Sequence, residues 1–123
     1  MQDIRLGVVE TQFAQLVWAH APMSTKELVT LCEARLNWKR TTTYTVLKKF
    51  YDRGIFVMEN RQVTVLISRE AFYAMQSEQF VTDGFGGSLP AFIAAFATRK
   101  SLSAKELGEI KALLAELEEG TVV

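Results

Sequence analysis

The chain has 123 residues, with fourteen basic and fourteen acidic side chains and a formal net charge of zero. This length fits one globular unit with a small appendage, and a hydrophobic content of 49 % excludes wholesale disorder. No apolar run reaches the ~20 residues that a membrane span needs, so no membrane insertion is predicted. The single cysteine, Cys32, excludes an internal disulfide and is typical of a cytoplasmic protein.

The first part of the sequence predicts three helices. Apolar residues at helical spacing run from Leu6 to Trp18, and Pro22 ends that helix. The run Ser24-Thr25-Lys26-Glu27 has the pattern of a capping box and opens a second helix. A third helix is predicted from about Lys39 to Arg53, with Gly54 as its C-cap. The side chains predicted to face the core are Leu6, Val9, Phe13, Leu16, Val17, Leu28, Leu31, Cys32, Leu36, Thr43, Val46, Leu47 and Phe50.

After Gly54 the hydrophobic period changes to that of strands. Two short antiparallel strands are predicted at Ile55 to Met58 and Gln62 to Ile67, joined by the polar turn 59–61. Three helices followed by a hairpin, with a short turn between helices two and three, predict a winged helix-turn-helix domain. The fold class is therefore mostly α with a small β hairpin.

The rest of the sequence predicts three further helices. Ser68 is the expected N-cap of a fourth helix that runs through Phe80, and the stretch 82–87 is expected to break regular structure as a hinge. A fifth helix is predicted at about 88–98, and a sixth from the capping box at Ser103 to near Gly120. We expect residues 1–81 to form a winged-helix DNA-binding domain and 82–123 a helical dimerisation region.

The zero net charge is the sum of a basic part and an acidic part. Residues 1–70 hold ten basic against seven acidic side chains, and residues 71–123 hold four against seven. Between Arg35 and Arg61, seven basic residues are accompanied by Asp52 and Glu59 alone among the acids. Such asymmetry favours a polyanion as partner, although on charge alone two ordinary solvated surfaces stay open as the alternative.

The outer face of the third helix indicates which polyanion. On a helical wheel Thr41, Thr45, Lys48 and Asp52 lie opposite the predicted core face, flanked by Thr42 and Lys49. Hydroxyls and amines contact phosphates and base edges, whereas β-branched threonines are unfavourable in a purely structural helix. A recognition helix is therefore favoured over a solvated face of chance composition. The candidate DNA-binding residues are Arg40, Thr41, Thr42, Thr45, Lys48, Lys49 and, at the wing tip, Arg61.

The C-terminal helices carry two apolar stripes that predict an interface. Two short helices cannot bury both stripes alone, and exposed patches of that size are rarely left uncovered. A second copy of the chain is the favoured cover, and folding back onto the winged helix is the alternative. The candidate dimer-interface residues are Leu89, Phe92, Ile93, Phe96, Leu107, Ile110, Leu113, Leu114 and Leu117.

Three motifs in order resemble a known family. They are Leu6-Gly7 with Leu16-Val17-Trp18; Thr41 to Leu47 with Lys49 and Arg53-Gly54; and Gly86-Gly87-Ser88-Leu89 with Leu102-Ser103. These resemble the first helix, the recognition helix and the dimerisation segment of the penicillinase-repressor (BlaI/MecI/CopY) family, over Leu6 to Glu118. The resemblance implies a bacterial, cytoplasmic, homodimeric repressor that binds a palindromic double-stranded DNA operator.

The resemblance also implies ways to end repression, and here the sequence departs from the family. In the β-lactam-responsive branch a membrane-embedded sensor protease triggers cleavage at an Asn-Phe bond, where this chain aligns Ala95-Phe96. The copper-responsive branch carries Cys-x-Cys motifs, which this sequence lacks. An indirect sensor protease is therefore one candidate partner, and release by a ligand is the alternative. The wing from Arg61 to Ser68 is shorter than usual for the family.

No feature of the sequence predicts catalysis. His20 lies beside Pro22 at a helix end, where a surface position is expected, and Cys32 is expected to be a buried, inert thiol. No glycine-rich phosphate loop, metal-ligand cluster or nucleophile–base pair is evident, so no catalytic residue, metal or cofactor is predicted. The alternative function is a winged helix that binds proteins, which would need apolar anchors in place of the threonines and lysines.

Overall fold

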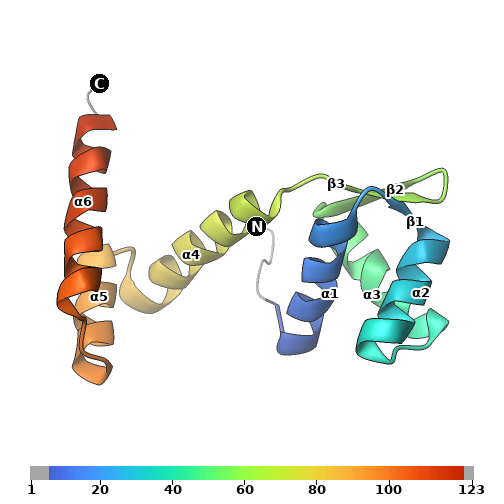
Figure 1. The fold of residues 1–123 in the computed structure, drawn as a ribbon, viewed down its shortest axis with the longest axis horizontal. Coiled ribbons are helices and arrows are strands. Elements are labelled where there is room, and N and C mark those ends of the chain that lie inside the picture. Colours follow the sequence, from blue (N-terminus) through green and yellow to red (C-terminus); the bar gives the residue numbers. More distant parts are fainter. Residues whose placement is uncertain (1–5, 121–123) are drawn as a thin grey trace. The chain divides into compact units, whose positions relative to one another are not determined.

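The structure is a computed structural model that describes residues 6–120 (Figure 1). Its elements are, in chain order, α1 (Val8–His20), β1 (Met23–Ser24), α2 (Thr25–Leu36), α3 (Arg40–Asp52), β2 (Phe56–Glu59), β3 (Gln62–Val65), α4 (Arg69–Phe85), α5 (Leu89–Arg99) and α6 (Ala104–Gly120). The chain divides into two compact units, one ending at Phe80 and one beginning at Val81. The predicted fold class is confirmed: a mostly helical chain with a small antiparallel sheet, in which a winged helix precedes C-terminal helices.

One aromatic core holds the first unit together. The ring of Phe13 stacks on Trp38 with 5.6 Å between centroids and lies 5.3 Å from Phe50, which in turn stacks on Phe56 at 5.1 Å. The sheet lies across one end of α1, α2 and α3 (Figure 1). The buried hydrophobic side chains of the described region are Phe13, Ala14, Val17, Met23, Leu28, Cys32, Leu47, Phe50, Ile55, Phe56, Val63 and Phe72. All of them belong to this unit, so its fold is fixed by its own core.

One predicted core residue of α1 is wrong. Val9 is 52 % exposed, whereas Ala14, which the spacing did not select, is fully buried. Val9 lies in the first turn of α1, one turn before the first buried residue, Phe13, so the core begins beyond it. The inner face predicted for α2 is confirmed, because Leu28 and Cys32 are buried and Leu31 and Leu36 pack against the core.

Serine caps open the predicted helices. Ser24 Oγ accepts the Glu27 backbone N–H at 3.0 Å, and Ser68 Oγ accepts that of Ala71 at 3.1 Å. At Ser103 the box is reciprocal, since the Glu106 carboxylate also accepts the Ser103 backbone N–H at 3.4 Å. At Ser24 the Glu27 carboxylate instead accepts from the serine hydroxyl, at 3.2 Å. Each cap satisfies a backbone donor that the first turn of a helix leaves free.

The sheet has three strands, where the sequence predicted two. Its order is β1-β3-β2, all antiparallel, with Met23 opposite Val63 and Phe56 opposite Val65. The missed strand β1 has two residues, too few to show a period. The two residues between β2 and β3, Asn60 and Arg61, have φ of 52° and 62°. A two-residue loop with both residues at positive φ is a type I′ turn, which matches the twist of the strands.

The predicted break at 82–87 is narrower in the structure. α4 continues to Phe85, and the helix ends at Gly86 and Gly87, which have φ of 58° and 82°. A single glycine such as Gly84 is tolerated inside a helix, whereas two successive residues at positive φ are not. Within the described residues no single helix is long and apolar enough to cross a membrane; α4 and α5, taken together as a bent pair, reach that length and composition.

Candidate functional site

The outer face of α3 is exposed as predicted. The side chains of Thr43, Leu47 and Phe50 are buried and fix the rotation of the helix. The exposed positions include Arg40, Thr41, Thr42, Thr45, Lys48 and Lys49. Because the buried face belongs to the aromatic core, the outer face is a rigid surface of hydroxyls and cations.

Thr45 presents a restricted set of groups to a partner. Its Oγ1 donates a hydrogen bond to the Thr41 carbonyl oxygen at 2.9 Å. A hydroxyl has one donor and two acceptor lone pairs, so the oxygen keeps accepting capacity and the methyl group stays exposed. Thr45 can therefore accept from a base amino group, or pack on a thymine methyl, without disturbing the helix.

Lys48 forms an ion pair with Asp52 on the outer face of α3. Its Nζ lies 2.8 Å from Asp52 Oδ2, one helical turn away, and the two side chains are 73 % and 55 % exposed. The hydrogen bond that Lys48 donates to Asp52, and next the negative charge of Asp52, raise the pKa of Lys48. Such exposed pairs contribute little free energy, so a phosphate can replace Asp52 as partner at small cost. Asp52 is the acid of α3 and places one negative charge on an otherwise neutral or basic face.

Arg40 begins α3 and is held by an aromatic ring. Its guanidinium carbon lies 5.6 Å from the centroid of the Tyr44 ring, within the range of a cation–π contact. The side chain of Thr25 hydrogen-bonds the Tyr44 phenol and lowers its pKa, and a hydrogen bond with Arg40 and the charges of Arg40 and Arg61 lower it further. The start of α2, the start of α3 and the wing therefore meet at Tyr44.

A groove of about 840 Å³ opens at this meeting point. It is lined by Thr25, Lys26, Val29, Thr30, Arg40, Tyr44, Met58 and Arg61. Arg40 and Arg61, which the sequence predicted as separate contacts, line the same groove. Lys26 and Tyr44 were not among the binding residues predicted from the sequence. Lys26 lies within the capping box of α2, and Tyr44 precedes Thr45 of the predicted outer face. The position of Lys26 beside a cap at the helix start was the one available signal.

The C-terminal stripes are exposed in the single chain. Among the described residues of α5 and α6 no side chain is buried. Phe92 and Ile110 are half-buried, and Phe92 contacts Phe85 and Phe96 with ring centroids 5.5 and 6.3 Å apart. The other candidate interface residues, each 37–53 % exposed, are Leu89, Ile93, Phe96, Leu107, Leu113, Leu114 and Leu117.

The two residues that would most readily serve catalysis lie apart from the groove. Cys32 is fully buried, and burial raises the pKa of its thiol, although a side-chain hydrogen bond with Thr43 lowers it. His20 is exposed, with Nδ1 2.9 Å from the Leu16 carbonyl oxygen. Within residues 6–120 no group of three or more His, Cys, Asp or Glu side chains is arranged to hold a metal ion.

Comparison with known proteins identifies the chain's relatives at the level of the family. A family model described as "Penicillinase repressor" matches residues 6–116, which is nearly the whole chain. No match was found among curated proteins. The matched segment contains the outer face of α3, the groove and most of α6.

Proposed function

The chain belongs to the penicillinase repressor family, and from that premise we propose that it acts as a homodimeric, sequence-specific DNA-binding repressor of transcription. In this proposal α3 enters the major groove of a palindromic operator and the wing lies beside it. The residues that contact DNA are Arg40, Thr41, Thr42, Thr45, Lys48, Lys49 and Arg61. No catalytic step is assigned to any residue.

The observation that carries the proposal is the outer face of α3. Its exposed side chains are threonines and cations, with Asp52 and, at its margin, Tyr51 as the exceptions, and the buried side chains of the same helix fix its orientation. Phosphate contacts need exposed cations, which Lys48 and Lys49 supply. Base contacts need short groups that reach an edge without clashing, which Thr45 supplies. A winged helix that binds proteins would need apolar anchors at these positions.

Dimerisation is supported by the exposed stripes of the C-terminal unit. Leu113, Leu114 and Leu117 are each about half exposed, although a monomer rarely leaves a continuous apolar stripe uncovered. A second copy presents the same stripe, so a two-fold interface is self-complementary. We propose that residues 82–123 form the dimerisation region and that 1–81 form the DNA-binding domain. Two recognition helices then lie about 34 Å apart, one turn of B-DNA.

Release from DNA follows from this arrangement. Each half-site contact is weak alone, so a signal that separates the two copies lowers the affinity for the whole operator. The Ala95-Phe96 bond lies inside α5, where the Ala95 carbonyl oxygen accepts a hydrogen bond from Thr98 Oγ1 at 2.7 Å. A protease therefore needs α5 to open locally before it can cut there, whereas a ligand that separates the copies does not.

The test uses duplex DNA at several salt concentrations. We expect the protein to select a palindromic duplex from a random pool, with log affinity falling by about 0.9 per phosphate contact for each unit of log salt. Lys49→Ala weakens binding to selected and random duplexes alike, because it removes a phosphate contact. Thr45→Ala changes which duplex is preferred. A flat salt response, or equal effects of both variants on both duplexes, contradicts the proposal.

A further inference from the structure

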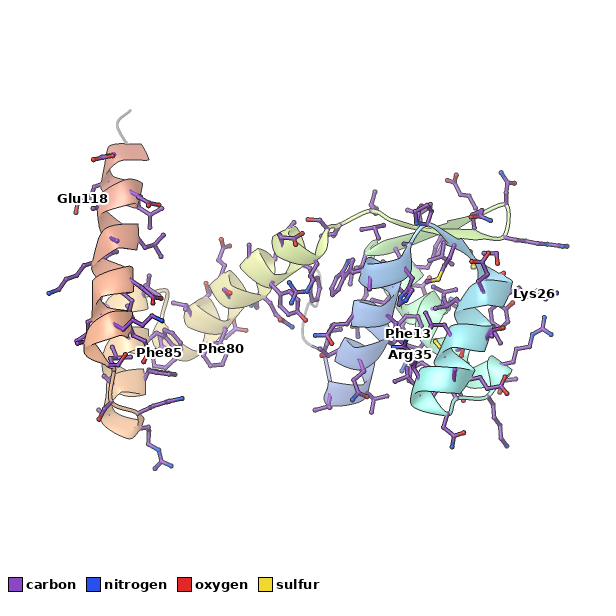
Figure 2. All side chains as sticks on the ribbon, in the orientation of Figure 1. Phe13, Lys26, Arg35, Phe80, Phe85 and Glu118 are labelled. Carbon is purple, nitrogen blue, oxygen red and sulfur yellow. The ribbon has the colours of Figure 1, made fainter. Side chains whose placement is uncertain are left out.

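The groove at the start of α2 and α3 gathers positive charge from three separate elements. Lys26 comes from α2, Arg40 from α3 and Arg61 from the turn of the wing. None of the described residues that line the groove is acidic. Lys26 lies on the outer side of α2, at the end that bears the sheet (Figure 2). Three cations in the lining of one open groove, with no acid among its described lining residues, favour an anion as its occupant.

The backbone fastens the wing tip to this groove. The Arg61 carbonyl oxygen accepts the Thr25 backbone N–H at 2.9 Å, and Ser24 pairs with Gln62 in the sheet. Arg61 also holds a φ of 62°, which is unfavourable for a residue with a Cβ and costs glycine nothing. An arginine at a position suited to glycine indicates that its side chain serves a purpose other than the turn.

Tyr44 connects the charged residues of the groove. Its ring lies under the Arg40 guanidinium, and its hydroxyl is hydrogen-bonded to the Thr25 side chain at the start of α2. The apolar side chains of Val29 and Met58 complete the lining. Tyr44 therefore limits the directions in which Arg40 can extend, and a guanidinium held in this way loses less freedom when it binds a phosphate.

We propose that this groove binds the phosphates of one DNA strand, with Lys26, Arg40 and Arg61 as its contacts and Tyr44 as the positioning residue for Arg40. The proposal rests on the function proposed above and extends it. DNA backbone is favoured over a small anion because the groove is open and continuous with the exposed face of α3. The recognition helix and the wing then both contact the phosphates of the same DNA strand.

The first test compares two variants of α2 in the full-length protein. Lys26→Gln removes a cation of the groove, whereas Arg35→Gln removes one from the last turn of the same helix. The two positions are nine residues apart in the sequence, about 13.5 Å along the helix axis. Binding to the duplex selected by the wild-type protein is measured by fluorescence anisotropy as a function of salt. In a two-fold dimer we expect Lys26→Gln to reduce the salt slope by about 1.8, and Arg35→Gln to leave it unchanged.

The outcomes separate the groove from the repressor function. If the wild-type protein selects a duplex with a steep salt slope and Lys26→Gln keeps that slope, the groove proposal is wrong and the function stands. If the wild-type protein selects no duplex, both fail. Arg61→Gln should repeat the effect of Lys26→Gln, and both altered side chains are exposed, so neither change disturbs the core.

The second test addresses the positioning role of Tyr44. Tyr44→Phe keeps a ring under Arg40, whereas Tyr44→Leu removes it. We expect the leucine variant to lose about two- to fivefold in affinity for selected and random duplexes alike, and the phenylalanine variant to recover most of that loss. Equal affinities for Tyr44→Leu and wild type would show that Arg40 needs no positioning. Trp fluorescence unfolding of each variant checks that the fold is intact.

A third test asks whether the groove binds the DNA backbone or a small free anion. Inorganic phosphate is titrated into the DNA-free protein and followed by NMR shifts of the Lys26, Arg40 and Tyr44 amides. Under the proposal free phosphate binds only weakly, because one phosphate engages few of the contacts that a DNA strand makes. Tight binding of phosphate that also displaces the duplex would reassign the groove to a small phosphorylated ligand and overturn the DNA assignment.

Discussion

The two units of the chain differ in how they bury apolar surface. The first unit has a buried core of its own, with Phe13, Phe50 and Phe56 fully or almost fully buried at its centre, although some side chains such as Leu66 stay exposed. The second unit has Leu113, Leu114 and Leu117 about half exposed, and none of its described side chains is buried. Burial of apolar area is the main free-energy gain in folding. The first unit can therefore be stable as a single chain, whereas we propose that the second gains its stability from association.

The largest expected effect tests whether the first unit depends on its own core. Phe13→Ala should lower the free energy of unfolding by about 3–5 kcal/mol, because it opens a cavity among three aromatic rings. Both tryptophans of the chain, Trp18 and Trp38, lie in this unit, so fluorescence during urea unfolding reports on it. Phe96→Ala, the matched change in the second unit, should leave this transition within about 0.5 kcal/mol. Equal losses would remove the distinction between the units.

The next effect tests whether the second unit depends on a partner. Leu114→Asp places a charge on the apolar stripe of α6 and should raise the dimer dissociation constant by about 100-fold or more. Ala112→Asp adds the same group about 200° away on the helical wheel and should leave the dimer intact. Sedimentation velocity over a concentration series measures both. A dimer that tolerates Leu114→Asp would move the interface elsewhere.

Alkaline pH should act on the first unit through its buried thiol. Burial raises the pKa of the Cys32 thiol above its ordinary value, so the folded protein holds the proton more tightly than the unfolded chain. The stability from this group is complete below the ordinary pKa of a cysteine thiol, about 8.5, and falls as the pH rises toward the folded pKa, by up to about 1.4 kcal/mol per pH unit. In urea unfolding measured at a series of pH values, Cys32→Ala should reduce the fall of the free energy of unfolding with rising pH. The lowered pKa of Tyr44 makes its contribution to stability rise with pH. Tyr44→Phe should therefore make the fall of the free energy of unfolding at alkaline pH steeper.

Local patterns were enough to predict most elements of the fold. Serine caps at Ser24, Ser68 and Ser103 each act within four residues, and the apolar spacing of α2 and α3 reports directly on the face that meets the core. The outer face of α3 could be predicted for the same reason, since it lies opposite the buried one. The DNA contacts assigned to that face stay a prediction.

Features assembled from distant segments could not be predicted in this way. β1 consists of Met23 and Ser24, and its partner β3 lies about forty residues later, so no local period marks it. The groove combines Lys26, Tyr44 and Arg61, which share no motif. The turn at Asn60 and Arg61 lacks the glycine that usually signals a type I′ turn. In each case the tertiary partner, rather than the local sequence, decides the conformation.

The smallest expected effect concerns backbone strain at Asn60 and Arg61, the turn of the wing in the first unit. Arg61→Gly should raise the free energy of unfolding by about 1 kcal/mol, because glycine adopts positive φ without a Cβ clash. Asn60→Gly should gain only a few tenths of a kcal/mol, since asparagine already tolerates this conformation. Urea unfolding measures both, and DNA affinity measured on the same samples should fall for Arg61→Gly and stay unchanged for Asn60→Gly. A variant that gains stability while it loses DNA affinity would show that the arginine is kept for binding at a cost to the fold. A loss of stability in Arg61→Gly would instead show that the arginine side chain supports the wing.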